Sequence, residues 1–206
     1  MRRIITWCAL VVVAAGALTS VAAPADAGSR VHRRAIITFD KNELDPSSSL
    51  LTWKVVRRTG DGPWRTVEEL SWRAGSGMGG PAGVNECAKG RGWLPDGTYR
   101  LRYHRNYHGN LIKGRALRLD DHRCRNGRWR VQLFIHTEQG LHNTQCADAE
   151  GDQVCRWEFP EVNDYASAGC IKLAPDDLAE LGRHFLKYYK AGVRYPKSRV
   201  VVRVVP

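Results

Sequence analysis

Ser167-Ala168-Gly169-Cys170-Ile171-Lys172-Leu173 is the stretch of this sequence that says most about its fold and its chemistry. It joins a polar, irregular segment, residues 138–166, to a clear helix pattern that begins at Pro175. Among the cysteines after residue 27, only Cys170 follows a glycine. Gly169 allows close approach of another part of the backbone. We therefore interpret Cys170 as a reactive cysteine in a turn just before a helix.

The cysteine count supports this interpretation. The chain has six cysteines, and Cys8 lies in an N-terminal segment that is expected to be removed. In an oxidising compartment, four of the remaining five can pair and one stays free. Four cysteines allow three connectivities; the short spacing favours Cys146–Cys155 and leaves Cys87–Cys124 as the second pair. Cys170 is then the free thiol.

The N-terminus has the pattern of a secretory signal peptide. Met1-Arg2-Arg3 precedes an apolar run over residues 4–23 and the small-residue site Ala25-Asp26-Ala27. We expect cleavage after Ala27, which leaves residues 28–206 as one domain without a membrane span. The alternative is an uncleaved anchor, since the apolar run has about the length of a bilayer span. Either way, the predicted location is extracytoplasmic: secreted or in the cell wall.

The chain is strongly basic, with a formal net charge of +11. An exported protein of this charge attracts anionic wall polymers, lipid head groups or nucleic acid. No zinc-finger spacing or RNA-binding motif is present, so we expect no nucleic-acid partner.

The hydrophobic pattern predicts a mainly β domain with one late α-helix. Thr59-Gly60-Asp61-Gly62-Pro63 indicates a hairpin turn, and residues 199–205 read as a buried closing strand. The other strands are expected over residues 35–39, 50–57, 64–72, 97–104, 114–119 and 128–136. The helix is expected from Pro175, with Gly192 as its C-terminal cap.

His136 is the predicted partner of Cys170. It ends the strand-like run Leu133-Phe134-Ile135-His136, 34 residues before Cys170. A thiol needs a nearby base or a positive field to act as a nucleophile. The amides of Gly169 and Cys170 could donate to a developing oxyanion, and Thr137 or a backbone carbonyl could orient the imidazole.

Three motifs in this order resemble the L,D-transpeptidase catalytic domain of the YkuD-like family. They are Gly92-Trp93-Leu94-Pro95-Asp96-Gly97-Thr98-Tyr99, Phe134-Ile135-His136-Thr137, and Ser167-Ala168-Gly169-Cys170-Ile171-Lys172-Leu173. The resemblance covers roughly residues 33–206 and implies a β-sandwich or barrel-like fold with one late helix.

The resemblance also implies a function in cell-wall biogenesis. Such a transferase uses Cys170 as nucleophile and His136 as general base. It forms a thioester with a peptidoglycan stem peptide, and the amine of a second stem resolves it into a 3→3 cross-link. Water as acceptor would instead make an L,D-carboxypeptidase. The contacts to the oxyanion and the contacts that orient the imidazole would come from Ser167, Ala168, Gly169 and Thr137. Lys172 would bind substrate. Such an enzyme needs no metal or organic cofactor.

The chain departs from the family pattern at three places. Ala168 stands where many members have His, and Lys172 replaces the commoner Arg, which keeps the charge without the bidentate fork. Residues 138–166 lengthen the gap between His136 and Cys170 and are expected to form a lid or wall over the substrate groove.

Other classes of protein remain open. A catalytically idle, basic wall-binding module would have the same charge, although intact Cys170 and His136 argue against it. In a papain-like endopeptidase the nucleophile usually precedes the histidine, and here the order is reversed. A zinc hydrolase is poorly supported, because His104 and His108 have no carboxylate between them and lie in a strand-like context.

Overall fold

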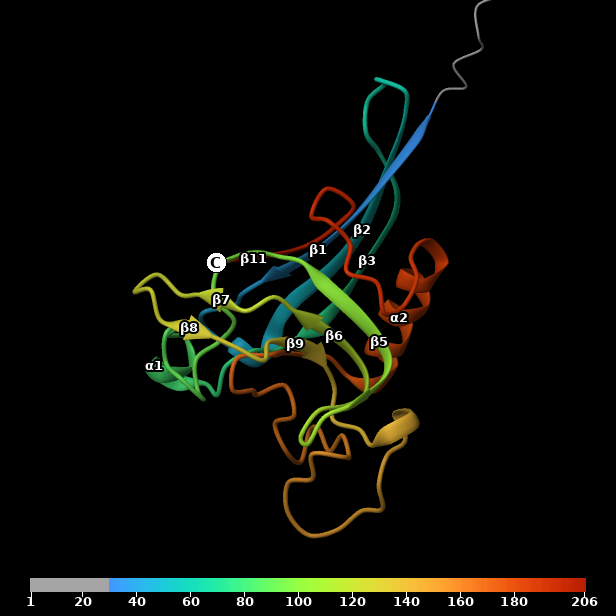
Figure 1. Ribbon diagram of the computed structural model, residues 1–206. Coiled ribbons are helices and arrows are strands. Elements are labelled where there is room, and N and C mark those ends of the chain that lie inside the picture. Colours follow the sequence, from blue (N-terminus) through green and yellow to red (C-terminus); the bar gives the residue numbers. More distant parts are fainter. Residues whose placement is uncertain (1–29) are drawn as a thin grey trace, which may run out of the picture.

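The computed structural model describes residues 30–206, and the expected signal peptide, residues 1–27, lies outside this range. The described part is mainly β, as predicted (Figure 1). Its strands are β1 (Val31–Asp40), β2 (Ser49–Thr59), β3 (Arg65–Ala74), β4 (Gly97–Tyr99), β5 (Leu101–His108), β6 (Lys113–Leu119), β7 (His122–Arg123), β8 (Trp129–Arg130), β9 (Phe134–His136), β10 (Ile171–Lys172) and β11 (Val200–Val205). The helices are α1 (Gly80–Gly83) and α2 (Pro175–Tyr188), with short 3-10 turns at Pro46–Ser48 and Leu141–Asn143.

The larger sheet has the strand order β3-β2-β1-β11-β4. The hairpin predicted around Gly60 joins β2 to β3, which pair antiparallel. β11 lies between β1 and β4 and is parallel to β1. It is the buried closing strand that the apolar run over residues 199–205 predicts, because a central strand has neighbours on both edges and side chains buried on both faces.

The smaller sheet has the order β10-β9-β6-β5, and it carries the candidate site. Two predicted strands are divided in the structure. Arg100 separates β4 from β5, and residues 131–133 separate β8 from β9. In the second break Gln132 has a φ of 57°, which lies outside the region that regular strands adopt. β8 therefore pairs with β7 in a separate ribbon instead of continuing into β9.

Helix α2 begins at Pro175, as predicted, with Asp176 and Asp177 in its first turn. It buries Leu178, Leu181 and Phe185. Gly192 is not its cap, because the helix ends at Tyr188 and the chain becomes extended at Tyr189. The Gly192 amide instead donates to the Tyr103 carbonyl at 2.8 Å. The single-turn helix α1, within the Gly-rich stretch after β3, was not predicted.

One hydrophobic cluster joins the two sheets and α2. The Phe185 ring lies 6.2 Å from the ring of Trp53 in the larger sheet and 5.1 Å from that of Tyr103 in the smaller one, measured between centroids. Residues 144–170, orange in Figure 1, loop out at the end of the molecule opposite the β2–β3 hairpin. Within residues 30–206, no helix has both the length and the apolar character needed to cross a membrane.

Candidate active site

Cys170 and His136 are brought together by two short parallel strands. In the pairing of β9 with β10, Ile171 lies beside Ile135 and Lys172 beside His136. Ile135 and Ile171 are fully buried in the core. Because side chains alternate along a strand, His136 and Lys172 point to the opposite face of the sheet. Cys170 directly precedes β10, so this pairing brings the predicted nucleophile and base onto neighbouring segments of the smaller sheet.

Ser167 holds the turn before Cys170. Its hydroxyl donates to the Cys170 carbonyl at 2.6 Å and accepts from the amides of Gly77 and Gly169, each at 3.3 Å. The Gly169 amide, expected as an oxyanion donor, therefore already has an acceptor. The Cys170 amide has none among the described residues, so it is the better-placed donor to an oxyanion.

Cys170 is the free cysteine of the described chain, and its side chain is half-buried. The structure pairs the other four as Cys87–Cys124 and Cys146–Cys155. The Cys170 thiol donates to the Gln132 carbonyl at 3.6 Å. Burial raises the pKa of this thiol to about 11, although the backbone amide of Phe134 and the positive charges of Lys172 and Arg130 act in the opposite direction. The resting side chain is therefore a neutral thiol.

His136 is 8% exposed, and its Nδ1 lies 3.0 Å from the Thr137 carbonyl. A carbonyl only accepts, so we assign the proton to Nδ1, which leaves Nε2 as the basic nitrogen. Burial, with the Lys172 charge beside it, lowers the pKa of His136 to about 4 and keeps the ring neutral. The Thr137 backbone thus does the orienting, whereas its hydroxyl is buried without a partner among the described residues.

Lys172, expected to bind substrate, is bonded within the protein. Its Nζ donates to Glu138 Oε1, and both side chains are largely buried. Burial, reinforced by Asp164 and Asp152, raises the pKa of Glu138 to about 7 against the opposing effect of Lys172. The charge of Lys172 acts on Cys170 and His136 from this fixed position.

Arg130 is the functional residue that the sequence analysis missed. Its guanidinium donates to the carbonyls of Gly92 and Ala168, each at 2.9 Å, and to the Glu86 carbonyl. Gly169 has a φ of +118°, and a Cβ there would lie 1.9 Å from Arg130 Nη2. Arg130 therefore fixes the backbone beside Cys170, and Gly169 makes room for it. In the sequence it is one arginine of a basic cluster, with nothing to mark it as buried.

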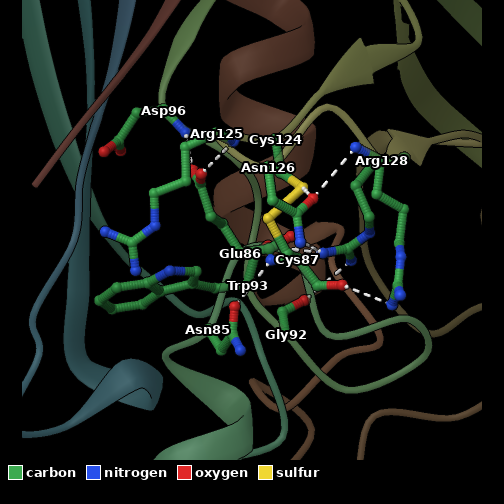
Figure 2. The surroundings of a disulfide bond; sticks show 11 residues. Asn85, Glu86, Cys87, Gly92, Trp93, Asp96, Cys124, Arg125, Asn126 and Arg128 are labelled. Carbon is green, nitrogen blue, oxygen red and sulfur yellow. Dashed lines mark hydrogen bonds between the residues drawn. A yellow bond between two sulfur atoms is a disulfide. The ribbon is translucent and has the colours of Figure 1, made fainter.

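The Cys87–Cys124 disulfide lies among residues of the loop after α1 and of the turn between β7 and β8 (Figure 2). It links the loop after α1 to the β7–β8 ribbon, whose last residue is Arg130. The Glu86 carboxylate accepts from the amides of Arg125 at 2.7 Å and Asp96 at 3.0 Å. A covalent and hydrogen-bonded frame thus extends from this disulfide to the turn that carries Cys170.

Comparison of the chain with protein-family models, with curated proteins and with solved structures gives no match. The class of the site therefore rests on its chemistry. It combines an unpaired thiol, in the turn that leads into β10, with a neutral imidazole at the end of the adjacent strand β9. Such a pair is suited to covalent acyl transfer.

Proposed function

We propose that this protein is an exported cysteine L,D-transpeptidase that acts on peptidoglycan stem peptides. The observation that carries the proposal is the pairing of β9 with β10, which brings His136 next to the strand that directly follows Cys170, with the imidazole oriented by the Thr137 carbonyl. The three sequence motifs of the L,D-transpeptidase family supply the substrate class.

In the first half-reaction the Cys170 sulfur attacks the carbonyl carbon of the third stem residue. Because the thiol and the imidazole are both neutral at rest, the proton moves from sulfur to His136 Nε2 as the C–S bond forms. The Cys170 amide donates to the oxyanion. The C–N bond then breaks, His136 returns the proton to the departing D-Ala amine, and a thioester remains on Cys170.

In the second half-reaction the side-chain amine of another stem attacks the thioester. His136 accepts a proton from this amine and delivers it to the Cys170 sulfur as the C–S bond breaks. The product is a 3→3 cross-link, and the free thiol is restored. Water in place of the amine gives the carboxypeptidase reaction with the same proton movements.

Charge and cysteine usage support an extracytoplasmic location. The net charge of +11 favours contact with anionic wall polymers, which would keep the enzyme at its substrate. Two disulfides suit an oxidising compartment.

A second candidate is an idle wall-binding module. The observation in its favour is the raised pKa of Cys170, since a thiol held neutral by burial is a poor nucleophile without an effective base. The two candidates differ in whether Cys170 can be acylated.

The deciding experiment is intact-mass spectrometry of the non-reduced protein before and after exposure to a carbapenem, a β-lactam that acylates such thiols. We expect one adduct per chain, none on Cys170→Ala, and adduct formation at least about 100-fold slower on His136→Gln. The rate of D-Ala release from a tetrapeptide stem should rank in the same way: highest for the wild type, much lower for His136→Gln, and zero for Cys170→Ala. Wild-type protein with a free thiol but neither adduct nor D-Ala release would instead support the wall-binding module.

A further inference from the structure

Three carboxylates far apart in the sequence meet beside the disulfide-closed segment. They belong to Glu138, Asp152 and Asp164, and one oxygen of each lies within 4.8 Å of one oxygen of each of the others. Glu138 follows β9, Asp152 lies between Cys146 and Cys155, and Asp164 precedes the turn that holds Cys170. Glu138 is 6% exposed and Asp164 is 1% exposed, whereas Asp152 is open to solvent.

Two oxygens of this cluster are buried with no hydrogen-bond donor in the described chain. Glu138 uses Oε1 to accept from Lys172, and its Oε2 has no partner. Asp164 uses Oδ2 to accept from the Glu158 amide, and its Oδ1 has no partner. A buried carboxylate oxygen without a partner is costly, and two in one cluster point to a ligand between them.

The charge balance identifies the kind of ligand. When all three carboxylates are ionised they carry three negative charges, and Lys172 neutralises one of them. A doubly charged cation would neutralise the remaining two. The exposed Asp152 gives such an ion access from solvent.

The donor chemistry selects among such ions. All three ligands offer oxygen, and the neighbouring Cys146 and Cys155 are held in a disulfide and offer no thiolate. Oxygen ligands favour hard cations over zinc. Ca²⁺ binds oxygens at about 2.3–2.6 Å, so ligands on one ion lie within about 5 Å of each other, as here.

We propose that Glu138, Asp152 and Asp164 form a calcium site that ties the Cys146–Cys155 segment to the end of β9. Backbone carbonyls and water would complete the shell of six to eight oxygens that calcium takes. The ion would also hold Glu138 in place against Lys172, which lies beside His136. The sequence analysis expected no metal. The three proposed ligands are 14 and 12 residues apart and follow no contiguous loop motif, so the sequence alone does not single them out. This site does not depend on the proposed transpeptidase function.

Calcium binding can be measured directly by calorimetric titration of the EGTA-treated, dialysed protein with CaCl2. We expect one ion per chain, with a Kd of about 10⁻⁴–10⁻³ M, as in extracellular modules. Asp152→Asn should weaken binding at least about tenfold, and because this side chain is exposed the variant should still fold. Glu150→Gln, at an exposed carboxylate of the same segment outside the cluster, should bind like the wild type.

Thermal unfolding is a second measurement, because the effect of Asp152→Asn on the Tm should have opposite signs in EGTA and in calcium. Calcium at about 100 times its Kd should raise the wild-type Tm by roughly 5–10 °C. In EGTA, Asp152→Asn should unfold at or above the wild-type Tm, because one of three like charges is gone; in calcium it should unfold below it. A purely structural role of Asp152 would lower the Tm under both conditions.

Three results would overturn the proposal. They are no calcium uptake by the wild type up to about 10 mM, equal binding by Asp152→Asn and wild type, and MgCl2 or ZnCl2 binding as tightly as CaCl2. Carbapenem acylation of Cys170 is a separate measurement, so failure of the calcium site and failure of the transpeptidase function are distinguishable.

Discussion

Three backbone carbonyls from two separate segments meet at one side chain, the guanidinium of Arg130. Glu86, Gly92 and Ala168 each contribute an acceptor, so a single residue connects the loop after α1 with the turn that carries Cys170. Arginine suits this position because its planar group presents five donors in a fixed arrangement and stays charged when buried. The position of the backbone beside Cys170 therefore depends on a residue outside the Cys–His pair.

Gly169→Ala should expel the Arg130 guanidinium from its position, since the added Cβ would lie 1.9 Å from Nη2. We expect a loss of at least about 2 kcal/mol in the free energy of unfolding, because buried carbonyls lose their donors. Urea denaturation of wild type and variant measures this loss. The control is Gly127→Ala, which also has a positive φ (+82°) but has no atom within 4 Å of an added Cβ. Equal losses of stability in the two variants would show that the close approach of Arg130 to Gly169 does not cause the effect.

The Cys170 thiol should react with iodoacetamide at a rate that rises with pH and reaches no plateau at neutral pH. Its pKa of about 11 leaves a thiolate fraction of about 10⁻⁴ at pH 7, and each pH unit raises that fraction about tenfold. The alkylation rate, followed by intact mass of the non-reduced protein, should therefore increase roughly 100-fold from pH 7 to pH 9. A rate that levels off near pH 7 would instead reveal a thiolate already formed at rest.

Among the secondary-structure elements, β3 and α2 are joined through the carboxylate of Glu68. Glu68 accepts from Trp53 at 2.8 Å, Lys187 at 2.6 Å and Tyr188 at 3.0 Å. These donors outweigh the opposing effect of burial and lower the pKa of Glu68 to about 2. The helix that follows the Cys170 turn is thereby attached to the edge strand of the larger sheet.

Glu68→Gln should destabilise the protein in a pH-dependent way. A carboxyl with a pKa of about 2 when folded and 4.5 when unfolded contributes up to about 3 kcal/mol above pH 4.5. This contribution disappears as the pH falls from 4.5 to 2, because the unfolded state then binds a proton that the folded state does not. Thermal unfolding of wild type and variant at pH 7 and pH 3 should therefore show a larger difference at pH 7.

The matched control for Glu68 is Glu69→Gln. Within residues 30–206 the ion-pair partner of Glu69 is the half-exposed Lys54, at 2.9 Å, so loss of the Glu69 charge should change stability by less than about 1 kcal/mol. A Glu68→Gln effect as small as this would show that the β3–α2 connection contributes little to stability.

For the molecule as a whole, the two disulfides close loops of very different length. Cys87 and Cys124 are 37 residues apart, and Cys146 and Cys155 are 9 apart. The first connects two regions that carry the Arg130 frame, and the second closes a short segment beside the proposed calcium ligands. Their loss should therefore affect stability and the site in different ways.

Replacing both members of the long pair, Cys87→Ser with Cys124→Ser, should cost more stability than replacing both members of the short pair. Loop-closure entropy predicts a difference of about 1 kcal/mol for these loop lengths. Denaturation of the two double variants in EGTA, so that calcium does not contribute, provides the comparison. A larger loss for Cys146→Ser with Cys155→Ser would contradict this ordering.

Local patterns in the sequence were enough to predict the longer elements, but not the short elements α1, β7 and β10. Alternation of apolar residues located β1, β2, β3, β6 and β11, and the Pro175–Phe185 pattern located α2, because these patterns depend on neighbouring residues alone. The boundaries around Gln132 and Gly192 were wrong, since a positive φ at Gln132 and an early helix end at Tyr188 are not encoded in hydrophobic periodicity.

Hydrophobic periodicity and the cysteine count were enough to predict a mainly β chain with one late helix and one unpaired cysteine. Packing of the whole chain was needed to pair β9 with β10 in parallel and so to bring His136 next to the strand that follows Cys170. The same packing buries Arg130 and brings Glu138, Asp152 and Asp164 together. Periodicity and cysteine count could not show this, because they are local or compositional properties. The partners of a buried charge, in contrast, are brought together from distant segments when the whole chain packs.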